Sequence, residues 1–570
     1  MPISPIDNVT VEVLANMYRA VVDEMAWVLL RSSHTTFVKE TQDFSTGLVT
    51  PEGEMFAAPH TKGATPLMGI PMGAGTTAVD DWAPGDVLVT NDPYATAGMV
   101  MQVNDLYAFR PIFCDGRLVC FAWAFIHCTD VGGAVPGSID MKHVEIHQEG
   151  TRLRPMRLFR RGELNEDIWN IFADNSRIPD LNWGDVSALL AALQIGERRV
   201  HDLIGRHSEP VVRSAMYQTL DNTERLTKQV LARIPAGSYS YVEYFEDDYT
   251  GDVPVRIEME LTAREDGTVK LDFTGSDPQV RAAINLPTGG HRHHPFLCLA
   301  LVNFVATHAE GLHLNAGILR CIDLRLPESS IVNADYPAAC GMRYTTACRI
   351  HEVVLGALNQ AVPTLVPSGG ASHAVITYIS TSEVERGGRV VVANPVQGGS
   401  GAGLDLDGES AIDFPAAFLR NVPVEVLEAE APVTVHRLRL RPDTEGAGSL
   451  RGGFGLEYAL QVRRPGAVVV MRGKDRHLFS SFGADGGRAG ATAGCIVTHA
   501  DGTVTDIGKE TVYRPDLNDV ITISTGGGGG KGDPIGRDPD AVAADVADGM
   551  ISPARADELY GVVLRDRRVD

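Results

Sequence analysis

The chain has 570 residues and a formal net charge of −23, from 50 basic and 73 acidic side chains. Proteins that bind nucleic acids need a basic face to neutralise phosphates, so this charge argues against that class. The length predicts roughly two to four domains or one large unit.

We expect neither a secretory signal peptide nor a membrane-spanning segment. The first residues, MPISPIDNVTVEV, lack a basic segment followed by an apolar one, and no apolar run is long enough to span a bilayer. The eight cysteines are scattered without a CxxC pair, which is typical of reduced thiols rather than of a disulfide framework. We therefore expect a cytoplasmic protein with no membrane or nucleic-acid partner.

The first predicted region covers residues 1–235. Apolar residues at helical spacing predict a helix over 9–33, with Asn8 or Thr10 as its cap. Strands and turns follow to about residue 140. Helical patterns return over 164–208 and 210–234.

Two further regions are predicted. Residues 236–375 combine alternating strand patterns, the loop LPTGGHRHHP and the apolar helix FLCLALVNFVATHA. Residues 376–570 are rich in β patterns and glycine, and end in two short helices separated at Gly549. The order of elements favours an α+β class with mixed sheets over regular βαβ alternation.

The most informative segment is a predicted β-hairpin. Strands over Leu106–Phe113 and Arg117–Ile126 are joined by a Cys-Asp-Gly turn, so their outer ends are neighbours. This places Asp105 beside His127, with Gln102 three residues upstream and Asp130 just beyond. Asp105, His127 and Gln102 suit a three-ligand pocket for a hard or borderline cation, and the same residues equally suit a polar hairpin mouth that caps backbone groups.

Motifs along the chain carry a family resemblance. The segment Asn91-Asp92-Pro93-Tyr94, then Asp105, His127, Asp130 and Gly132-Gly133, resembles the B subunit of ATP-dependent hydantoinases and 5-oxoprolinases. That family also includes caprolactamase and subunits of acetone and acetophenone carboxylases. Similar runs recur in family order: KETQDFS at 39–45, His60, HQEG at 147–150, NSRIP at 175–179, Asn315-Ala316-Gly317, Arg343 with Thr345-Thr346, RGGFG at 451–455 and GGGGGKGDP at 526–534. Several spaced motifs in order are specific as a set.

The resemblance implies a metal site formed by Gln102, Asp105 and His127. The chain departs from the family at Gln102, where a histidine is usual, and at Cys128, where a second histidine is common. One carboxylate, one imidazole and one amide would favour Mn²⁺, Mg²⁺ or Zn²⁺ with open positions. Asp130 would fix the tautomer of His127 from outside the metal sphere.

Three further residues match family positions and are catalytic candidates. Asp43 can supply a carboxylate, and His60 suits acid–base work near neutral pH. Arg343 can pair with a carboxylate or phosphate through its planar fork. The alternative roles are a capping carboxylate, a satisfied core histidine and a structural ion pair.

Two other segments contain residue types found in binding sites. The run TGGGGGKGDP fails the phosphate-loop pattern because Lys531 precedes Gly532 rather than Ser or Thr, so a tight backbone passage is the expectation. The HRHH segment, with His291, His293 and His294, fits either a solvated loop or a contact to an acidic intermediate. Without an ATP site of its own, the chain is expected to depend on an actin-like A-type ATPase subunit in a hetero-oligomer, as the resemblance implies.

Three functional hypotheses follow. In the first, the chain is the catalytic B-type subunit of an ATP-dependent cyclic-amide hydrolase, acting on a lactam or hydantoin phosphorylated by the partner. In the second, it is a subunit of an ATP-dependent ketone carboxylase. In the third, it is a metal-free, non-catalytic paralogue, a reading that rests on the Gln102 and Cys128 departures.

Overall fold

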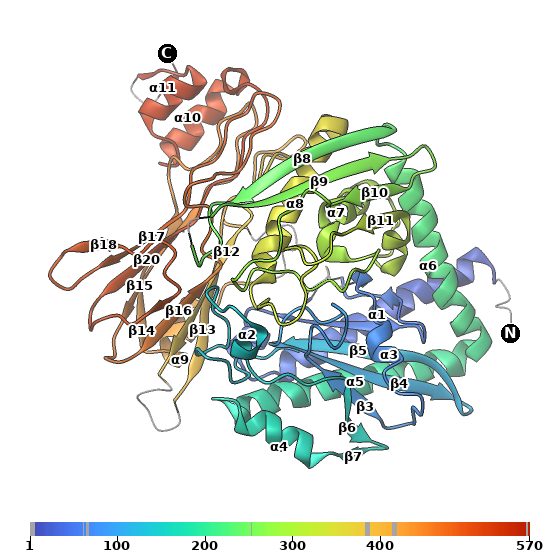
Figure 1. Ribbon diagram of the computed structural model, residues 1–570. Helices are drawn as coiled ribbons and strands as arrows, with labels where there is room; N and C mark the ends of the chain where they lie inside the picture. Colours follow the sequence, from blue (N-terminus) through green and yellow to red (C-terminus); the bar gives the residue numbers. More distant parts are fainter. Residues whose placement is uncertain are drawn as a thin grey trace. The chain divides into compact units, whose positions relative to one another are not determined.

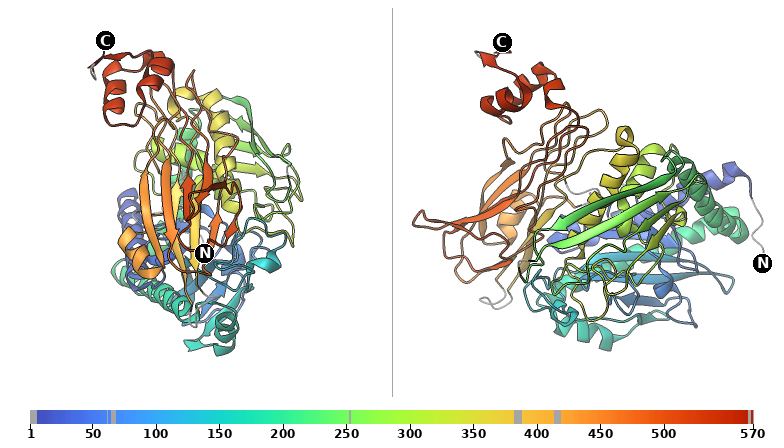
Figure 2. Two further views of the ribbon diagram at one scale, coloured as in Figure 1. Left: turned by 90° about the vertical axis from the view of Figure 1, so that its left-hand side faces the viewer. Right: turned by 45° about the horizontal axis from the view of Figure 1, so that its top comes forward.

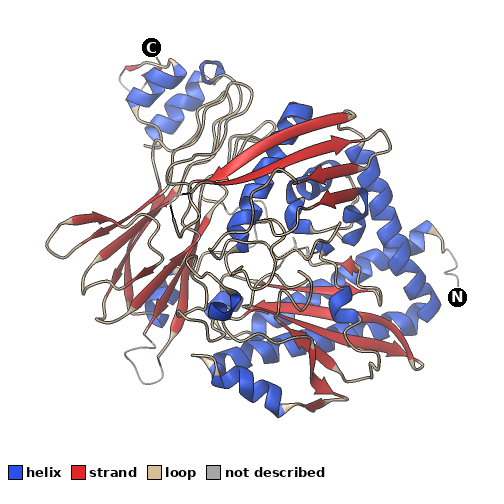
Figure 3. Ribbon diagram, in the orientation of Figure 1, coloured by secondary structure: helices blue, strands red, loops and turns tan. Residues whose placement is uncertain are grey.

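The computed structural model describes residues 6–60, 62–63, 68–251, 253–381, 388–412, 419–565 and 568–569. The chain divides into two compact units: residues 1–238, 261–343 and 418–420 form the first, and residues 239–260, 344–417 and 421–570 form the second. The segment 236–375 is thus shared between both units. The α+β class is confirmed (Figure 3). Among the described residues, no helix has the length and apolar character needed to cross a bilayer.

A seven-stranded sheet forms the centre of the first unit. Its strand order is β2-β1-β5-β4-β3-β6-β7, and neighbouring strands pair antiparallel. The strands are β1 Phe44–Val49, β2 Met55–Ala57, β3 Val87–Thr90, β4 Asp105–Cys114, β5 Arg117–His127, β6 Met156–Arg160 and β7 Glu163–Leu164. The hairpin strands therefore agree with the prediction to within one residue at each end.

Two long helices, α1 (Asn8–Ser32) and α5 (Pro179–His207), pack together and against this sheet (Figure 1). Apolar side chains of both helices and of β5 form one core. Gly196 permits the close approach, because a methyl group there would lie 2.7 Å from Met25 Sδ. The predicted helix at the N-terminus is confirmed, but its cap is Asp7, which accepts the Thr10 amide, rather than Asn8 or Thr10.

The remaining elements of the first unit surround that core. They are α2 Thr36–Lys39, α3 Gly73–Thr76, η2 Ile146–Glu149, α4 Glu166–Asp174, α6 Glu209–Leu231, β10 Val269–Asp272, η3 Pro295–Leu297, α7 Leu299–His308, η4 Ala316–Cys321 and β11 Ile322–Arg325. Of these, α4, α6 and α7 lie where helices were expected. Strands β10 and β11 pair in parallel.

The second unit is built on two sheets with a shared apolar core (Figure 2). One has the order β13-β12-β16-β19 and the other β14-β15-β20-β17-β18. The strands are β12 Ala374–Ser380, β13 Val390–Gln397, β14 Val433–Leu440, β15 Leu456–Val462, β16 Val468–Arg472, β17 Gly494–Thr498, β18 Val504–Asp506, β19 Val512–Tyr513 and β20 Val520–Ser524. Side chains from both sheets, such as Val469 and Leu460, are fully buried. This arrangement fits a β-sandwich.

Helices complete the second unit. Helix α8 (Arg343–Ala361) was not expected from the sequence, and it belongs to the second unit from Tyr344 onward. Helix α9 spans Val424–Glu430. The two expected C-terminal helices are α10 (Pro539–Ala547) and α11 (Pro553–Tyr560), and Gly549 lies between them with φ +71°. Strands β8 (Gly237–Phe245) and β9 (Val255–Ala263) are divided between the two units.

Candidate functional site

Asp105 and His127 are direct partners in the β4–β5 register. Their side chains meet, with His127 Nδ1 2.8 Å from Asp105 Oδ1, and both residues are buried. The expectation that the two hairpin ends meet is confirmed. The alternation of the hairpin placed both residues on the same face without any long-range information.

Strand β1 adds Asp43 to this pair. Phe44 pairs with Ile126, so Asp43, immediately before the strand, lies opposite His127. The His127 amide donates to the Asp43 carbonyl at 3.0 Å, and Asp43 Oδ2 lies 3.7 Å from His127 Nδ1. Three adjacent strands therefore present Asp43, His127 and Asp105 in a row. The sequence did not reveal that β1 pairs with β5, because that pairing is non-local.

Gln102 and Arg343 close the cluster. Gln102 Nε2 lies 2.6 Å from Asp105 Oδ1 and 2.9 Å from His127 Nδ1. Arg343 Nη1 donates to Gln102 Oε1 at 2.7 Å, and Arg343 Nη2 donates to Asp105 Oδ2 at 3.0 Å. The guanidinium thus contacts both the amide and the carboxylate.

The charges in this cluster compensate one another. Burial raises the pKa of Asp105, but the Arg343 guanidinium and hydrogen bonds from His127 and Gln102 outweigh it, and the net pKa falls below 3.8. Asp105 therefore stays ionised near neutral pH. Tyr107, two residues along the same face of β4, is fully buried, and burial raises its pKa with a further contribution from the Asp105 carboxylate.

Glu149 is a site residue that the sequence analysis did not single out as acid or base. It is fully buried, and its Oε1 accepts the amides of Cys340 (2.8 Å) and Gly341 (2.6 Å), two residues before Arg343. Burial raises its pKa to about 7, although those hydrogen bonds and Arg343 oppose the shift. The signal was a carboxylate inside the HQEG motif, whose burial the sequence does not reveal.

Asp130 organises the loop that follows β5. Its Oδ1 accepts the amides of Gly132 and Arg177 at 3.1 Å each, and its Oδ2 accepts the Gly137 amide at 3.0 Å and Arg177 Nη1 at 2.9 Å. His127 Nδ1 lies 2.8 Å from Asp105 Oδ1, so Asp105 orients the imidazole in the place expected for Asp130. Asp130 therefore links the hairpin to the NSRIP motif before α5.

His60 is placed apart from these residues. Its side chain is exposed, its amide donates to Asp23 Oδ1 at 2.9 Å, and it lines a small hollow with Arg19 of α1 and His313. Cys128, the second departure from the family pattern, is buried, and burial raises the pKa of its thiol well above 9. We assign Cys128 a packing role.

The side chains of the hairpin mouth present a poor set of ligand atoms for a divalent metal. Asp105 and His127 present ligand atoms, but Gln102 turns its amide nitrogen toward them and its oxygen toward Arg343. An amide NH₂ donates and is not a metal ligand. Among the described residues, no group of three or more His, Cys, Asp or Glu side chains is arranged to hold a metal. As arranged, these residues do not fit a three-ligand metal site.

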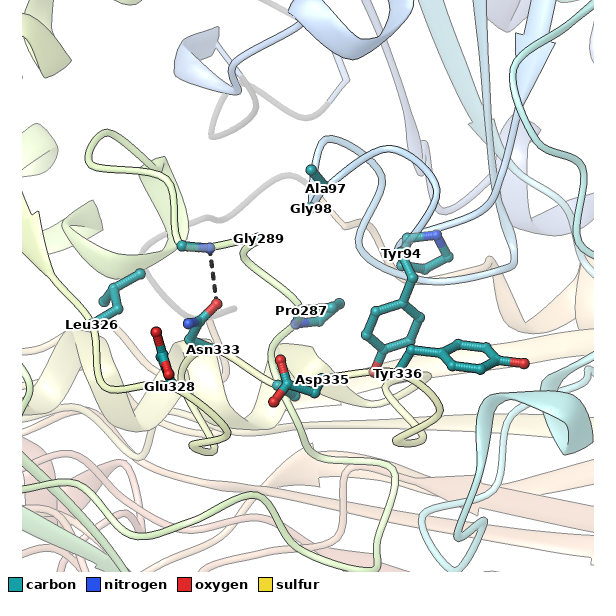
Figure 4. A pocket seen from close by; sticks show the side chains of 13 residues that line it. Tyr94, Ala97, Gly98, Pro287, Gly289, Leu326, Glu328, Asn333, Asp335 and Tyr336 are labelled. Atoms are coloured by element: carbon teal, nitrogen blue, oxygen red, sulfur yellow. Dashed lines mark hydrogen bonds between the residues drawn. The ribbon is translucent and has the colours of Figure 1, made fainter.

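A cavity of about 550 Å³ lies in the same unit (Figure 4). Figure 4 shows Tyr94 and Tyr336 toward one end and Glu328 with Asn333 toward the other. Its described lining includes the carboxylates of Glu328 and Asp335 and no cationic side chain. The cavity is therefore polar, partly aromatic and acidic.

Two loops connect this cavity to the hairpin mouth. The loop after β3 lines the cavity at Tyr94 and reaches the cluster at Gln102, and the segment before α8 does the same between Tyr336 and Arg343. Tyr94 Oη donates to the Ala338 carbonyl at 2.6 Å, and Gln102 accepts from Arg343 at 2.7 Å. The loops thus run side by side from the cavity to the cluster.

The HRHH segment is only partly exposed: Arg292 and His293 are exposed, His291 is half-buried and His294 is buried. His294 is fully buried, with Nε2 3.4 Å from the Gly98 carbonyl, and burial lowers its pKa to about 3. The solvated-loop alternative is therefore wrong for His294. Gly289, with φ +62°, explains the burial, because a methyl group there would lie 2.2 Å from the Ala97 carbonyl oxygen. Only glycine permits this approach.

The glycine run of the second unit is a packed backbone passage, as expected. The amides of Gly527, Gly528, Gly529 and Gly530 donate to the carbonyls of Ala491, Gly453, Gly369 and Arg488. Lys531 Nζ donates to two carbonyls, of Pro363 and Val366, at 2.7 Å each. These donors are engaged by protein oxygens, so the run does not form a phosphate cradle.

Comparison of the sequence with known proteins assigns the chain to a family. Residues 7–534 match the family model described as Hydantoinase B/oxoprolinase, and the chain belongs to that family. It is 29% identical to caprolactamase subunit beta of Pseudomonas jessenii over 98% of this chain and 96% of that protein. It is 27% identical to 5-oxoprolinase 1 of Arabidopsis thaliana over 93% of this chain and 42% of that protein.

Solved structures agree with this assignment. The crystal structure of ATP-dependent caprolactamase from Pseudomonas jessenii matches with a TM-score of 0.88 and 26% identity, covering 99% of this chain and 98% of that one. A nucleotide-free structure of acetone carboxylase matches with a TM-score of 0.89, covering 99% of this chain and 81% of that one. Its identity is 18%, so it shows the fold alone.

Proposed function

We propose that this chain is the catalytic B-type subunit of an ATP-dependent cyclic-amide hydrolase that works with an A-type ATPase partner. The observation that carries the proposal is the row of half-buried Asp43 with buried His127 and Asp105, together with Arg343. This row lies in a chain that aligns over nearly its whole length with a caprolactamase subunit named beta. Groups that transfer protons and stabilise negative charge thus share one site.

The chemistry assigns a role to each group. The partner transfers the terminal phosphoryl group of ATP to the amide oxygen, and water adds to the activated carbon. The water proton passes to His127, held by Asp105, and the carbon–nitrogen bond breaks as the ring nitrogen takes a proton. A second water hydrolyses the remaining acyl phosphate to carboxylate and phosphate. Arg343 stabilises negative charge on oxygen during these steps.

The cavity bears on the substrate class. Because Glu328 and Asp335 line it and its described lining has no cation, an anionic substrate is disfavoured there. We propose that neutral or cationic lactams and hydantoins are preferred over carboxylated ones. Tyr94 and Tyr336 supply faces and edges for the ring of such a substrate.

The test is reconstitution with the partner subunit and ATP. Three five-membered lactams that differ in one substituent form a matched panel: 5-(aminomethyl)pyrrolidin-2-one, 5-methylpyrrolidin-2-one and 5-oxoproline. We expect ADP formation that matches ring-opened product, with 5-oxoproline the poorest substrate. The double variant Glu328→Gln, Asp335→Asn should reduce the difference in turnover between 5-oxoproline and the other two lactams. His127→Ala should lower kcat by about 100-fold or more, whereas Asp115→Asn, at the opposite end of the same hairpin, should not.

The ketone carboxylase is the alternative, and labelled bicarbonate separates it. A carboxylase joins the carbon of ¹³C-bicarbonate to its product, whereas hydrolysis leaves a product without the label. ADP formation driven by acetone or acetophenone, with ¹³C in the product and no lactam opening, would replace the hydrolase proposal. ADP formation in the absence of any substrate would support neither reaction and would favour a non-catalytic paralogue.

A further inference from the structure

We propose that the hairpin-mouth cluster of this chain works without a divalent metal, because Arg343 supplies the positive charge there and holds Gln102 in a non-ligating orientation. The inference goes beyond the proposed function and does not depend on it. It concerns the four side chains of Gln102, Asp105, His127 and Arg343.

The orientation of Gln102 follows from Arg343. A guanidinium has only donors, so the Gln102 atom 2.7 Å from Arg343 Nη1 must be the amide oxygen. The NH₂ group then faces Asp105 Oδ1 at 2.6 Å and His127 Nδ1 at 2.9 Å. Turning the amide so that oxygen joined those two atoms would set an NH₂ against the guanidinium. The three potential ligand atoms therefore cannot converge while Arg343 is in place.

The charge of the site is already balanced. Asp105 is 3% exposed and Arg343 is 8% exposed, and the two form an ion pair at 3.0 Å. Asp105 Oδ1 is engaged by Gln102 and His127, and its Oδ2 by Arg343. A divalent ion at Asp105 would lie beside a buried guanidinium, with repulsion that little water screens.

The spare hydrogen-bonding groups of the cluster also suit an anion. Arg343 Nε and Tyr107 Oη are buried and have no partner among the described atoms. Both carry a hydrogen to donate, and an oxygen of an anion or of water satisfies a donor, whereas a cation does not. These two donors therefore favour binding of an oxyanion over binding of a metal ion.

The test measures metal retention by the full chain. Wild type and Arg343→Ala are freed of metal with a chelator, incubated with Mn²⁺ or Zn²⁺, desalted and analysed by inductively coupled plasma mass spectrometry. Thermal unfolding is followed with and without the ion. We expect wild type to retain less than about 0.1 equivalent, with an unchanged Tm. Arg343→Ala should have a lower Tm, gain close to one equivalent and recover part of its Tm with the ion, because Gln102 is then free to turn.

Variants at both ends of the hairpin locate any metal that binds. Wild type that retains about one equivalent, loses it in Asp105→Asn and keeps it in Asp115→Asn would overturn the proposal. Metal that Asp105→Asn holds as well as wild type lies elsewhere and agrees with it. Arg343→Gln, which keeps the side-chain bulk, replaces Arg343→Ala if the latter does not fold. Failure of a folded Arg343 variant to gain metal would contradict the role given to that arginine.

Discussion

Single side chains decide the chemistry of the hairpin mouth. Arg343 was a catalytic candidate because of its family motif. Its contacts show that it binds the Gln102 amide and the Asp105 carboxylate at the same time. His60 carried a comparable motif and lies exposed beside Asp23. Glu149 had no assigned role and turns out to be a fully buried carboxyl next to the Arg343 segment. Burial and pairing, rather than residue type, separate these cases.

Glu149 leads to a prediction about pH. Its pKa rises from 4.5 to about 7 on folding, so between these values the folded state binds a proton that the unfolded state has lost. Stability is therefore greatest below pH 4.5 for this group and is lost as pH rises through 7, by about 3 kcal/mol in total. Glu149→Gln cannot ionise, so its unfolding free energy should fall less between pH 5 and 7.5.

Urea unfolding at a series of pH values measures this difference. Glu265→Gln removes an exposed carboxylate of the same unit and serves as the control. Equal pH slopes for wild type and Glu149→Gln would show that Glu149 titrates normally in the folded protein.

Elements position these side chains through register. The β4–β5 hairpin sets Asp105 opposite His127, and the pairing of β1 with β5 brings Asp43 next to His127 at the same end of these strands. A shift of one residue would move these side chains to the other face of the sheet. In the second unit, the glycine run holds its register by close backbone packing, with its amides donating to carbonyls of other segments.

The glycine run gives a prediction at this scale. A methyl group at Gly528 would lie 1.8 Å from the Ser400 carbonyl oxygen, and neither backbone can yield easily. Gly528→Ala should therefore lose more than about 3 kcal/mol of stability or fail to fold. Gly116→Ala is the matched control: its φ is +76°, but nothing lies within 4 Å, so it should cost only about 1 kcal/mol. Soluble yield and urea unfolding give the comparison, and similar losses for both would contradict the packing argument.

At the scale of the whole molecule, the chain is expected to act with a partner that binds ATP. The amides of Gly527–Gly530 and Lys531 Nζ donate to protein carbonyls, so these groups do not offer themselves to phosphates. The chain alone should show no saturable binding of a fluorescent ATP analogue at up to about 1 mM, a range that covers typical nucleotide affinities. Saturable binding of the ATP analogue should appear when the partner subunit is added. Saturable binding by the chain alone that is lost in Lys531→Ala would contradict this expectation.

Local patterns in the sequence were enough to predict the individual elements and to find the ordered motifs. Helical spacing predicted α1 and α5, alternation predicted the hairpin, and the hairpin placed Asp105 beside His127, because each of these depends on residues near in the chain. The motifs in order indicated the family, which the match over residues 7–534 shows. The helix α8 was missed, although it begins at Arg343 and carries that residue to the site.

The way in which distant segments complete the cluster became visible only in the folded chain. The β1–β5 pairing places Asp43, and the segment before α8 brings Arg343 to residues more than 200 positions earlier in the chain. Burial raises the pKa of Glu149, and the guanidinium of Arg343 orients the Gln102 amide. These properties arise from non-local packing and desolvation, which no local pattern in the sequence encodes.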